Sequence, residues 1–428
     1  MKAKKIEIVF LIISVLAGIA AIYSPSDYYQ KNRQKNQSAR DFYSYPYPYP
    51  YPYPSPSIIV TNTNNSGSGS LRQAIADANN GSRIEFLPSL AGETIHLQTE
   101  LEITKNLAID GSSLNSKIII SGDSDYDGDG DTHLMTIASF AKVVIKNVNF
   151  TKGKNASLLT PGGINNFGEL KLSNCIFSLN TGDLGGALLD HGNITISDCS
   201  FTNNTANNGG AIFIDAHAGG TISRAIFRNN TASYDGGAIS NIGDLLIIRM
   251  SEFSENSALS FGGAIASAGE LNVLNSTIYG NISNNGGAIT ISNPDNLPSI
   301  YNSLYFSTLS DNVGGGLYLR NDANVFVNSS ILANSIGSPD CYSENGELNE
   351  NTHNIIETNA AGINNCGTPL SSSDPMLTPL SNNGGTTQTM ALLAGSPAID
   401  AAYDEYCDEI DQRGISRPQG THCDIGAF

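Results

Sequence analysis

Residues 194–214 read ITISDCSFTNNTANNGGAIFI, and residues 220–240 repeat the same order of features as GTISRAIFRNNTASYDGGAIS. Each stretch has alternating aliphatic residues, a phenylalanine followed three positions later by asparagine, and a Gly-Gly-Ala-Ile or closely similar motif. The apolar residue and its asparagine recur at steps of 24, 26, 26, 25, 31 and 22 residues, as Phe177/Asn180, Phe201/Asn204, Phe227/Asn230, Phe253/Asn256, Ile278/Asn281, Leu309/Asn312 and Ile331/Asn334. A repeat of this length indicates a solenoid, a propeller or an array of small units.

The repeating unit is built from β-strands. Apolar residues alternate with serine, threonine and asparagine, which is the period of a strand. The alternation slips once per unit, usually at a residue such as Asn174 or Asp198 that tolerates a bend. Each unit is therefore a strand, a bend, a second strand, an asparagine turn, a glycine turn and a third strand. A propeller would need four strands in each blade. We therefore predict an all-β fold, a right-handed parallel β-helix, with an inward column of Ile145, Leu172, Ile196, Ile222, Ile248, Val273, Leu304 and Phe326.

Like residues should stack on like in such a fold, because equivalent positions of successive coils lie ~4.8 Å apart. Each buried aliphatic side chain then contributes about 1.5–3 kcal/mol. Stacked asparagines can pass amide hydrogen bonds along their column. Cys175 and Cys199 occupy one inward column, one coil apart, with side chains pointing the same way. A disulfide between them would be strained, so we expect stacked thiols.

Both ends of the solenoid need caps. Residues 58–83 form the expected N-terminal cap, with an amphipathic helix in the segment from Ser70 to Asn79. The parallel β-helix is expected over residues 84–339. Residues 340–428 lose the repeat and are expected to form an irregular C-terminal cap. Its four cysteines predict two disulfides in an exported protein, and sequence proximity alone favours the pairs Cys341–Cys366 and Cys407–Cys423.

The N-terminal residues indicate export. Residues 1–23 combine a basic start with an apolar run, which is typical of a signal peptide, and an uncleaved membrane anchor is the alternative. Residues 24–57 end in an alternating Tyr-Pro tract that favours extended polyproline II geometry, so we expect a disordered spacer. The protein is therefore expected to be secreted or at the surface of a bacterial cell.

The charge distribution excludes one class of partner. The chain has a formal net charge of −18, and no lysine follows Lys171. An acidic body of this kind repels phosphate backbones, so nucleic-acid binding is excluded.

An acidic run suggests a metal. Five aspartates alternate with serine, tyrosine and glycine, as Asp123, Asp125, Asp127, Asp129 and Asp131. Hard oxygen ligands at alternate positions suit Ca²⁺, and Gly128 stands at the sixth position of an EF-hand-like register. The twelfth position is Leu134, so the bidentate glutamate of that motif is missing. A structural Ca²⁺ site and a solvated acidic loop stay open as alternatives.

Several motifs resemble a known family. The Gly-Gly-Ala-Ile and Phe-x-x-Asn coils resemble the repeats of bacterial β-helix surface proteins, including the chlamydial polymorphic outer-membrane proteins. Residues 70–75 read SLRQAI and resemble the Cys-Ser-Leu-Arg-Glu-Ala-Ile segment that opens many of them, with Gly69 in place of cysteine and Gln73 in place of glutamate. The tail resembles the choice-of-anchor segment at Asp374-Pro375, Asn382-Asn383-Gly384-Gly385, Gly395-Ser396-Pro397-Ala398-Ile399-Asp400, Asp411-Gln412-Arg413-Gly414, Arg417-Pro418 and Cys423-Asp424-Ile425-Gly426-Ala427-Phe428.

The resemblance implies export and a β-helix but no single activity. In that family a sorting signal normally follows the choice-of-anchor segment, whereas this sequence stops at Phe428. An N-terminal anchor, a released protein and a truncated product all stay open.

The sequence is compatible with two functions. The first is a non-catalytic surface or secreted protein for adhesion, display or envelope structure, with an extracellular glycan or a host or cell-surface component as partner. The alternative is a polysaccharide lyase or glycoside hydrolase, which would need paired carboxylates or a cation-assisted base. The candidate catalytic residues are Asp190, His191, Asp215 and His217, placed on adjacent coils by the repeat. The sequence has no tryptophan and no adjacent Asp-Asp pair, so we favour the first function.

Overall fold

The computed structural model describes residues 57–155, 157–293 and 301–428. The expected signal or anchor (1–23) and the expected spacer, except for its last residue, lie outside the described residues. Within the described ranges, no helix is both long enough and apolar enough to cross a membrane.

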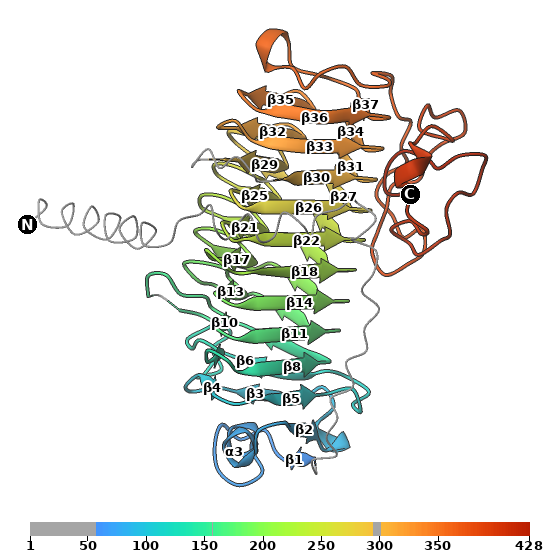
Figure 1. The fold of residues 1–428 in the computed structure, drawn as a ribbon. Coiled ribbons are helices and arrows are strands. Elements are labelled where there is room, and N and C mark those ends of the chain that lie inside the picture. The colour runs from blue at the N-terminus through green and yellow to red at the C-terminus, as the bar shows by residue number, and fades with distance from the viewer. Residues whose placement is uncertain (1–56, 156, 294–300) are drawn as a thin grey trace, which may run out of the picture. The chain divides into compact units, whose positions relative to one another are not determined.

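The described chain folds as a parallel β-helix, which confirms the expected fold class. Each complete coil contributes one strand to each of three long sheets, the first and last coils contribute fewer, and every pairing between named strands is parallel. Ile196 lies beside Ile222, and Ile222 beside Ile248, as the expected inward column requires. In Figure 1 the front strands point to the right while the chain climbs and returns behind them, which makes the coil right-handed.

The three long sheets divide the coil into three sides. Sheet 1 contains β1 (Ile58–Val60), β2 (Ser82–Phe86), β5 (Leu107–Asp110), β8 (Lys142–Lys146), β11 (Glu169–Ser173), β14 (Asn193–Ser197), β18 (Gly219–Ser223), β22 (Leu245–Arg249), β26 (Glu270–Leu274), β30 (Asn302–Tyr305), β33 (Asn324–Asn328) and β36 (Glu347–Thr352). Sheet 2 contains β3 (Thr94–His96), β6 (Ile118–Ser121), β9 (Val148–Thr151), β12 (Ile176–Ser178), β15 (Ser200–Thr202), β19 (Ile226–Arg228), β23 (Glu252–Ser254), β27 (Thr277–Tyr279), β31 (Thr308–Ser310), β34 (Ile331–Ala333) and β37 (Ile355–Ile356). Sheet 3 contains β4 (Leu101–Ile103), β7 (Met135–Ile137), β10 (Ile164–Asn166), β13 (Leu188–Asp190), β17 (Ile212–Ile214), β21 (Ile239–Asn241), β25 (Ile265–Ser267), β29 (Ile289–Ser292), β32 (Leu317–Arg320) and β35 (Cys341–Glu344).

The shorter elements lie at corners and ends. A fourth sheet follows the asparagine turn in the central coils and contains β16 (Thr205–Ala206), β20 (Thr231–Ala232), β24 (Ser257–Ala258) and β28 (Ile282–Ser283). The described residues also contain the single 3-10 turns η2 (Pro88–Leu90), η3 (Gly362–Asn364) and η4 (Asp404–Tyr406). The parallel ladder runs from Ile58 to Ile356, beyond the expected body of residues 84–339 at both ends. Backbone pairing needs no aromatic or glycine marker, so coils without those markers still join the sheets.

The core is a set of stacked columns. Five phenylalanines form one column with ring centroids 4.6–4.9 Å apart, namely Phe150, Phe177, Phe201, Phe227 and Phe253. All five are fully buried. Cys175 and Cys199 are buried free thiols, as the shared inward column predicts. Stacking of rings adds to the free energy gained from burying their surface, and it holds successive coils in register.

A buried asparagine ladder follows the phenylalanine column. Each side-chain amide donates to the asparagine Oδ1 of the next coil, from Asn180 to the last acceptor, Asn312, at 2.9–3.1 Å.

The expected last member, Asn334, lies outside the ladder. The inward residue of that coil is Leu332 rather than Ile331, because Leu309 pairs with Leu332. Val327 likewise replaces Phe326 in the column of Ile145. The predicted register of the last repeat is therefore one residue too early, because its apolar run Ile331-Leu332-Ala333 gives no alternation to count from.

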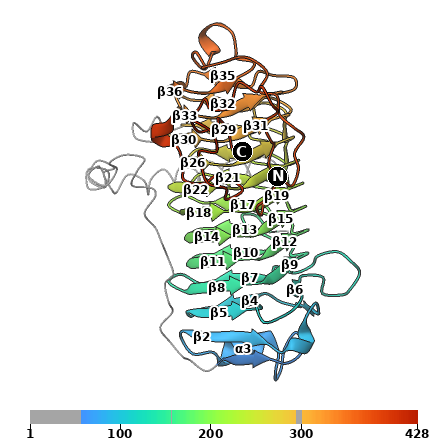
Figure 2. The same cartoon turned by 90° about the vertical axis from the view of Figure 1, so that its right-hand side faces the viewer.

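The N-terminal cap contains the expected helix, α3 (Leu71–Asp77), which closes one end of the coil (Figure 2). The Ser70 side chain accepts a hydrogen bond from the Gln73 amide, which is a standard N-cap. Leu71, Ala74 and Ile75 are buried toward the core. The helix therefore covers apolar surface that the first coil would otherwise expose to water.

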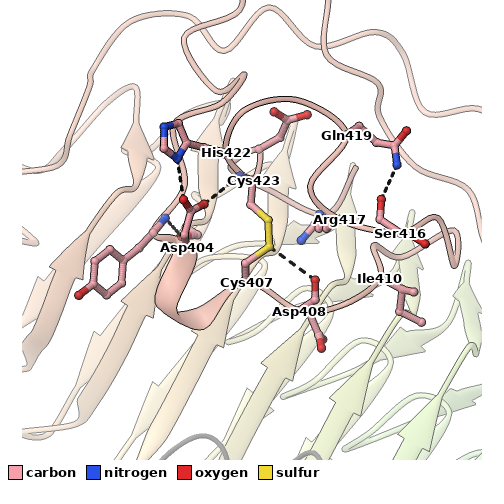
Figure 3. Close-up of a disulfide and its surroundings, with 12 residues drawn as sticks. Asp404, Cys407, Asp408, Ile410, Ser416, Arg417, Gln419, His422 and Cys423 are labelled. Carbon is pink, nitrogen blue, oxygen red and sulfur yellow. Dashed lines mark hydrogen bonds and ion pairs between the residues drawn. A yellow bond between two sulfur atoms is a disulfide. The ribbon is translucent and has the colours of Figure 1, made fainter.

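The C-terminal segment is irregular and disulfide-bonded. The bridges are Cys341–Cys366 and Cys407–Cys423, the pairs that proximity favoured. Figure 3 shows the second bridge beside the pair formed by His422 and Asp404.

The segment does not simply extend the solenoid, as a cap at the end of the coil would. It folds back along the flank of sheet 2 (Figure 1), where Gly426 N donates to Ser329 O and Gln388 N donates to Glu252 Oε2, both at 2.9 Å. Thr277 donates to Gln412 Oε1 at 2.7 Å. The segment therefore satisfies polar groups that this face of the coil presents.

Candidate functional site

The first candidate site is a row of histidine and acidic residues at the turn from sheet 3 to sheet 1. Register explains why two of the expected residues meet. Asp190 pairs with Ile214, so the next residues, His191 and Asp215, lie side by side. His191 Nδ1 is 2.6 Å from Asp215 Oδ2. This hydrogen bond is the main cause that lowers the pKa of Asp215.

Asp190 differs from the His191–Asp215 pair because its side chain is buried. It is fully buried, and its Oδ1 accepts hydrogen bonds from Asn166 Nδ2 at 2.6 Å and from the Gly192 amide at 3.3 Å. Its Oδ2 has no partner among the described residues. Burial raises the pKa of Asp190 to about 7. A carboxyl group without solvent access cannot reach a substrate, so the structure places Asp190 in the core.

His217 lies further along the row and is almost fully exposed. Its Nδ1 is 3.8 Å from Asp244 Oδ1. Glu270 follows one coil later, and burial, with a contribution from the Asp244 carboxylate, raises its pKa to about 7. Sequence reasoning missed Asp244 and Glu270. The signal was the repeat itself, because a step of one coil from His217 reaches Asp244 and another reaches Glu270.

A shallow hollow adjoins His217 and Asp244. Gly219 and Gly220 in β18 have no side chains, and the hollow above them has a volume of about 280 Å³. A Cβ at Gly220, where φ is +150°, would lie 1.9 Å from the Ile194 carbonyl oxygen. The glycine is therefore required by the close approach of the neighbouring coil, and the hollow is a consequence of that requirement.

The second candidate site is a groove near the N-terminal cap. It has a volume of about 580 Å³ and is lined by Thr63, Asn64, Asn65, Ser66, Gly92, Glu93, Thr94, His96, Gln98, Ser124 and Tyr126. The rings of His96 and Tyr126 meet with centroids 4.1 Å apart. One wall of the groove is the segment 63–66. Within it, Asn65 Oδ1 accepts hydrogen bonds from the Gln98 amide at 3.0 Å and from Arg72 at 3.1 Å, which attach this wall to the coil and to α3.

The wall that carries Ser124 and Tyr126 is the acidic loop between β6 and β7. His96 Nδ1 approaches the Asp123 carbonyl oxygen at 2.6 Å, so the loop is attached to sheet 2 at its first aspartate. The Asp123 side chain pairs with Lys152 at 2.9 Å, and Lys152 is the main cause that lowers the pKa of Asp123. One carboxylate oxygen from each of Asp123, Asp125 and Asp131 lies within 4.8 Å of the other two. Asp127 and Asp129 do not belong to this group. Within the described ranges, it is the one cluster of three or more potential metal ligands.

Comparison with known proteins finds a repeat family. Residues 198–215, 224–242 and 251–268 match the Chlamydia polymorphic membrane protein repeat. Each match includes the asparagine turn, the glycine pair and a strand of sheet 3. No curated protein sequence matches the chain. The crystal structure of pectate lyase Pel9A is similar over 87% of this chain and 96% of that chain, with 16% identity and a TM-score of 0.36.

The matched repeats support an exported bacterial protein exposed at the cell surface. They do not reach residues 70–75 or 374–428, so the resemblances noted for those segments stay predictions.

Proposed function

We propose that this protein is a bacterial surface module that acts by binding an extracellular glycan, in adhesion or display, rather than by cleaving one. The observation that carries the proposal is the groove beside the N-terminal cap, which is the larger of the two cavities described above. Ligand sites combine a concave surface with a few polar groups that fix orientation.

The lining of the groove suits a sugar. A sugar ring has hydroxyl groups around its edge and C–H groups on its faces. Asn64 and Gln98 offer side-chain amide groups, which both donate and accept hydrogen bonds, whereas the Oδ1 of Asn65 is already engaged by Gln98 and Arg72. Tyr126 is 73% exposed and offers a ring face to the solvent. The proposed ligand is therefore a glycan unit that meets a ring on one side and amides on another.

Charge narrows the class of glycan. Glu93 lines the groove, and the acidic loop forms one wall of it. The whole chain carries a formal charge of −18. A polyanionic glycan such as a polyuronate would be repelled at this site. Neutral glycans and amino sugars are the expected ligands.

A glycan array tests the proposal with three proteins. The wild type should bind neutral or amino-sugar glycans, and Tyr126→Ala should weaken binding on the order of tenfold, as expected for loss of a central aromatic contact. Tyr234→Ala is the matched control, because Tyr234 is a similarly exposed tyrosine that does not line the groove. Binding that is unchanged in Tyr126→Ala, or restricted to acidic glycans, contradicts the proposal.

One observation favours the alternative, a glycan-cleaving enzyme. Glu270, with its pKa raised to about 7, lies in the row one coil beyond Asp244, and Asp244 and His217 line the shallow hollow above Gly219 and Gly220. A carboxyl group that stays protonated near neutral pH can act as a general acid. Shortening of a glycan chain by the wild type, with loss of that activity in Glu270→Gln, would establish the enzyme. If no glycan in the panel is shortened, this second function is rejected.

A further inference from the structure

The loop between β6 and β7 contains five aspartates at alternate positions, and its fold brings the carboxylates of three of them together. The group consists of Asp123, Asp125 and Asp131, and each pair of donor oxygens lies within 4.8 Å. Asp125 and Asp131 are exposed and approach from the solvent side, whereas Asp123 forms the buried base of the group. Like charges at this separation repel each other unless a cation lies between them.

An independent observation concerns Asp123. Only 4% of this residue is exposed, and its Oδ1 has no hydrogen-bond partner among the described residues. The backbone amides of Tyr126 and Gly128 lie near the carboxylate and lower its pKa, but neither makes a hydrogen bond of normal geometry to Oδ1. A buried carboxylate oxygen that lacks a partner is costly. Oδ2 is already paired with Lys152, so Oδ1 is the oxygen that still needs a positive partner.

The loop backbone holds the three carboxylates in this arrangement. Ser124 donates from both its amide and its hydroxyl group to Asp131 Oδ2, at 3.0 and 2.9 Å. Gly128 has a φ of +103°, a conformation that side chains disfavour, and it allows the loop to turn back. The loop is therefore closed at both ends around the carboxylate group.

We propose that Asp123, Asp125 and Asp131 bind one Ca²⁺. Three carboxylate oxygens supply hard ligands, and a Ca²⁺ shell of six to eight oxygens is completed by water and loop carbonyl groups. Ca²⁺ tolerates flexible ligand geometry, whereas Mg²⁺ demands near-ideal octahedral geometry, so a loop that supplies three carboxylates suits Ca²⁺ better.

The expected affinity for Ca²⁺ is low because the loop lacks a bidentate glutamate. In the EF-hand-like register the twelfth residue is Leu134, which is fully buried in the core and cannot act as a bidentate ligand. Lys152 also competes for Asp123. A site with few charged ligands should bind in the range of extracellular modules, roughly 10⁻⁴–10⁻³ M.

The absence of tryptophan from the chain allows a specific probe. Tyr126 lies between two aspartates of the loop, so Tyr126→Trp introduces the one tryptophan of the chain, whose emission can be excited apart from that of the tyrosines and reports on the loop. Calcium titration should shift its emission with a single transition, and calorimetry of the wild type should give one site per chain. MgCl₂ at the same ionic strength should give a markedly weaker response.

Charge-matched variants distinguish coordination from general attraction. Asp125→Asn and Asp131→Asn each remove a proposed ligand from an exposed position, so the coil should stay folded, and each should weaken Ca²⁺ binding at least tenfold. Asp129→Asn removes the same charge from the same loop but not from the three-carboxylate group, so it should stay within about threefold of the wild type.

Two results would overturn the proposal. One is no heat and no emission change up to 20 mM Ca²⁺, about twentyfold above the weakest expected dissociation constant. The other is an equal loss of affinity in all three variants, which would indicate diffuse attraction to an acidic loop. Both measurements use Ca²⁺ alone, so they are independent of whether the groove binds a glycan.

Discussion

Replacement of Asp190 by asparagine should make the protein more stable at alkaline pH. Asp190 is fully buried at the end of β13, with Asn166 as its side-chain partner and, within the described part of the chain, no partner for Oδ2. The residue that pairs with it in the following coil is Ile214, whose side chain cannot donate a hydrogen bond. Ionisation therefore puts a charge between the amide of Asn166 and an aliphatic neighbour, and asparagine removes that charge at every pH.

The magnitude follows from the pKa. Burial raises the pKa of Asp190 from 3.8 to about 7. The stability that this group contributes is fully present below pH ~3.8 and is lost as pH rises toward 7, because the unfolded chain releases its proton first. At about 1.36 kcal/mol per pH unit, the total loss is on the order of 4 kcal/mol, of which roughly 2.5 kcal/mol falls between pH 5 and pH 8.

Urea denaturation followed by circular dichroism at pH 5 and pH 8 measures this difference. The free energy of unfolding of the wild type should fall between the two pH values by roughly 2.5 kcal/mol more than that of Asp190→Asn. Glu270 also has a raised pKa, but it is present in both proteins and cancels in the comparison. Equal pH dependence of the two proteins would refute the assignment of Asp190 as a buried, protonated carboxyl group.

Three further predictions test the columns and the C-terminal segment. Phe227→Asp should abolish the folded β-helix, because it buries an unpaired charge in the middle of the ring stack; an unchanged melting curve would contradict the stack. Asn230→Leu interrupts the amide ladder and leaves buried groups on the adjacent coils without partners, so the free energy of unfolding should drop by about 1–3 kcal/mol in urea titrations. Non-reducing peptide mapping of exported protein should find both C-terminal bridges, and free thiols at all four positions would exclude them, namely Cys341, Cys366, Cys407 and Cys423.

The candidate sites were only partly predictable from the sequence. The pairing of His191 with Asp215 follows from counting one coil forward along the sequence. The same count, started from His217, would have located Asp244 and then Glu270. The burial of Asp190 does not follow, because it depends on which side of the coil the last residue of β13 faces. The groove is also invisible in the sequence, since its walls come from segments that are about 30 residues apart and that share no motif.

The fold itself was determined by the sequence alone, because its information is local and repeated. A strand period, a bend, an asparagine and a glycine pair recur every coil, and stacking like on like then gives the same inward columns in every coil. The repeat failed only where three apolar residues in a row, Ile331 to Ala333, removed the alternation that sets the register.

The tertiary structure alone decided what depends on surfaces that do not repeat. The C-terminal segment lies along sheet 2 because particular outward groups, such as Glu252 and Thr277, find partners there. Three of five aspartates converge because the loop is closed by Ser124 and anchored through His96. Such contacts join residues far apart in the chain, and their geometry depends on the position of the whole coil rather than on any local pattern.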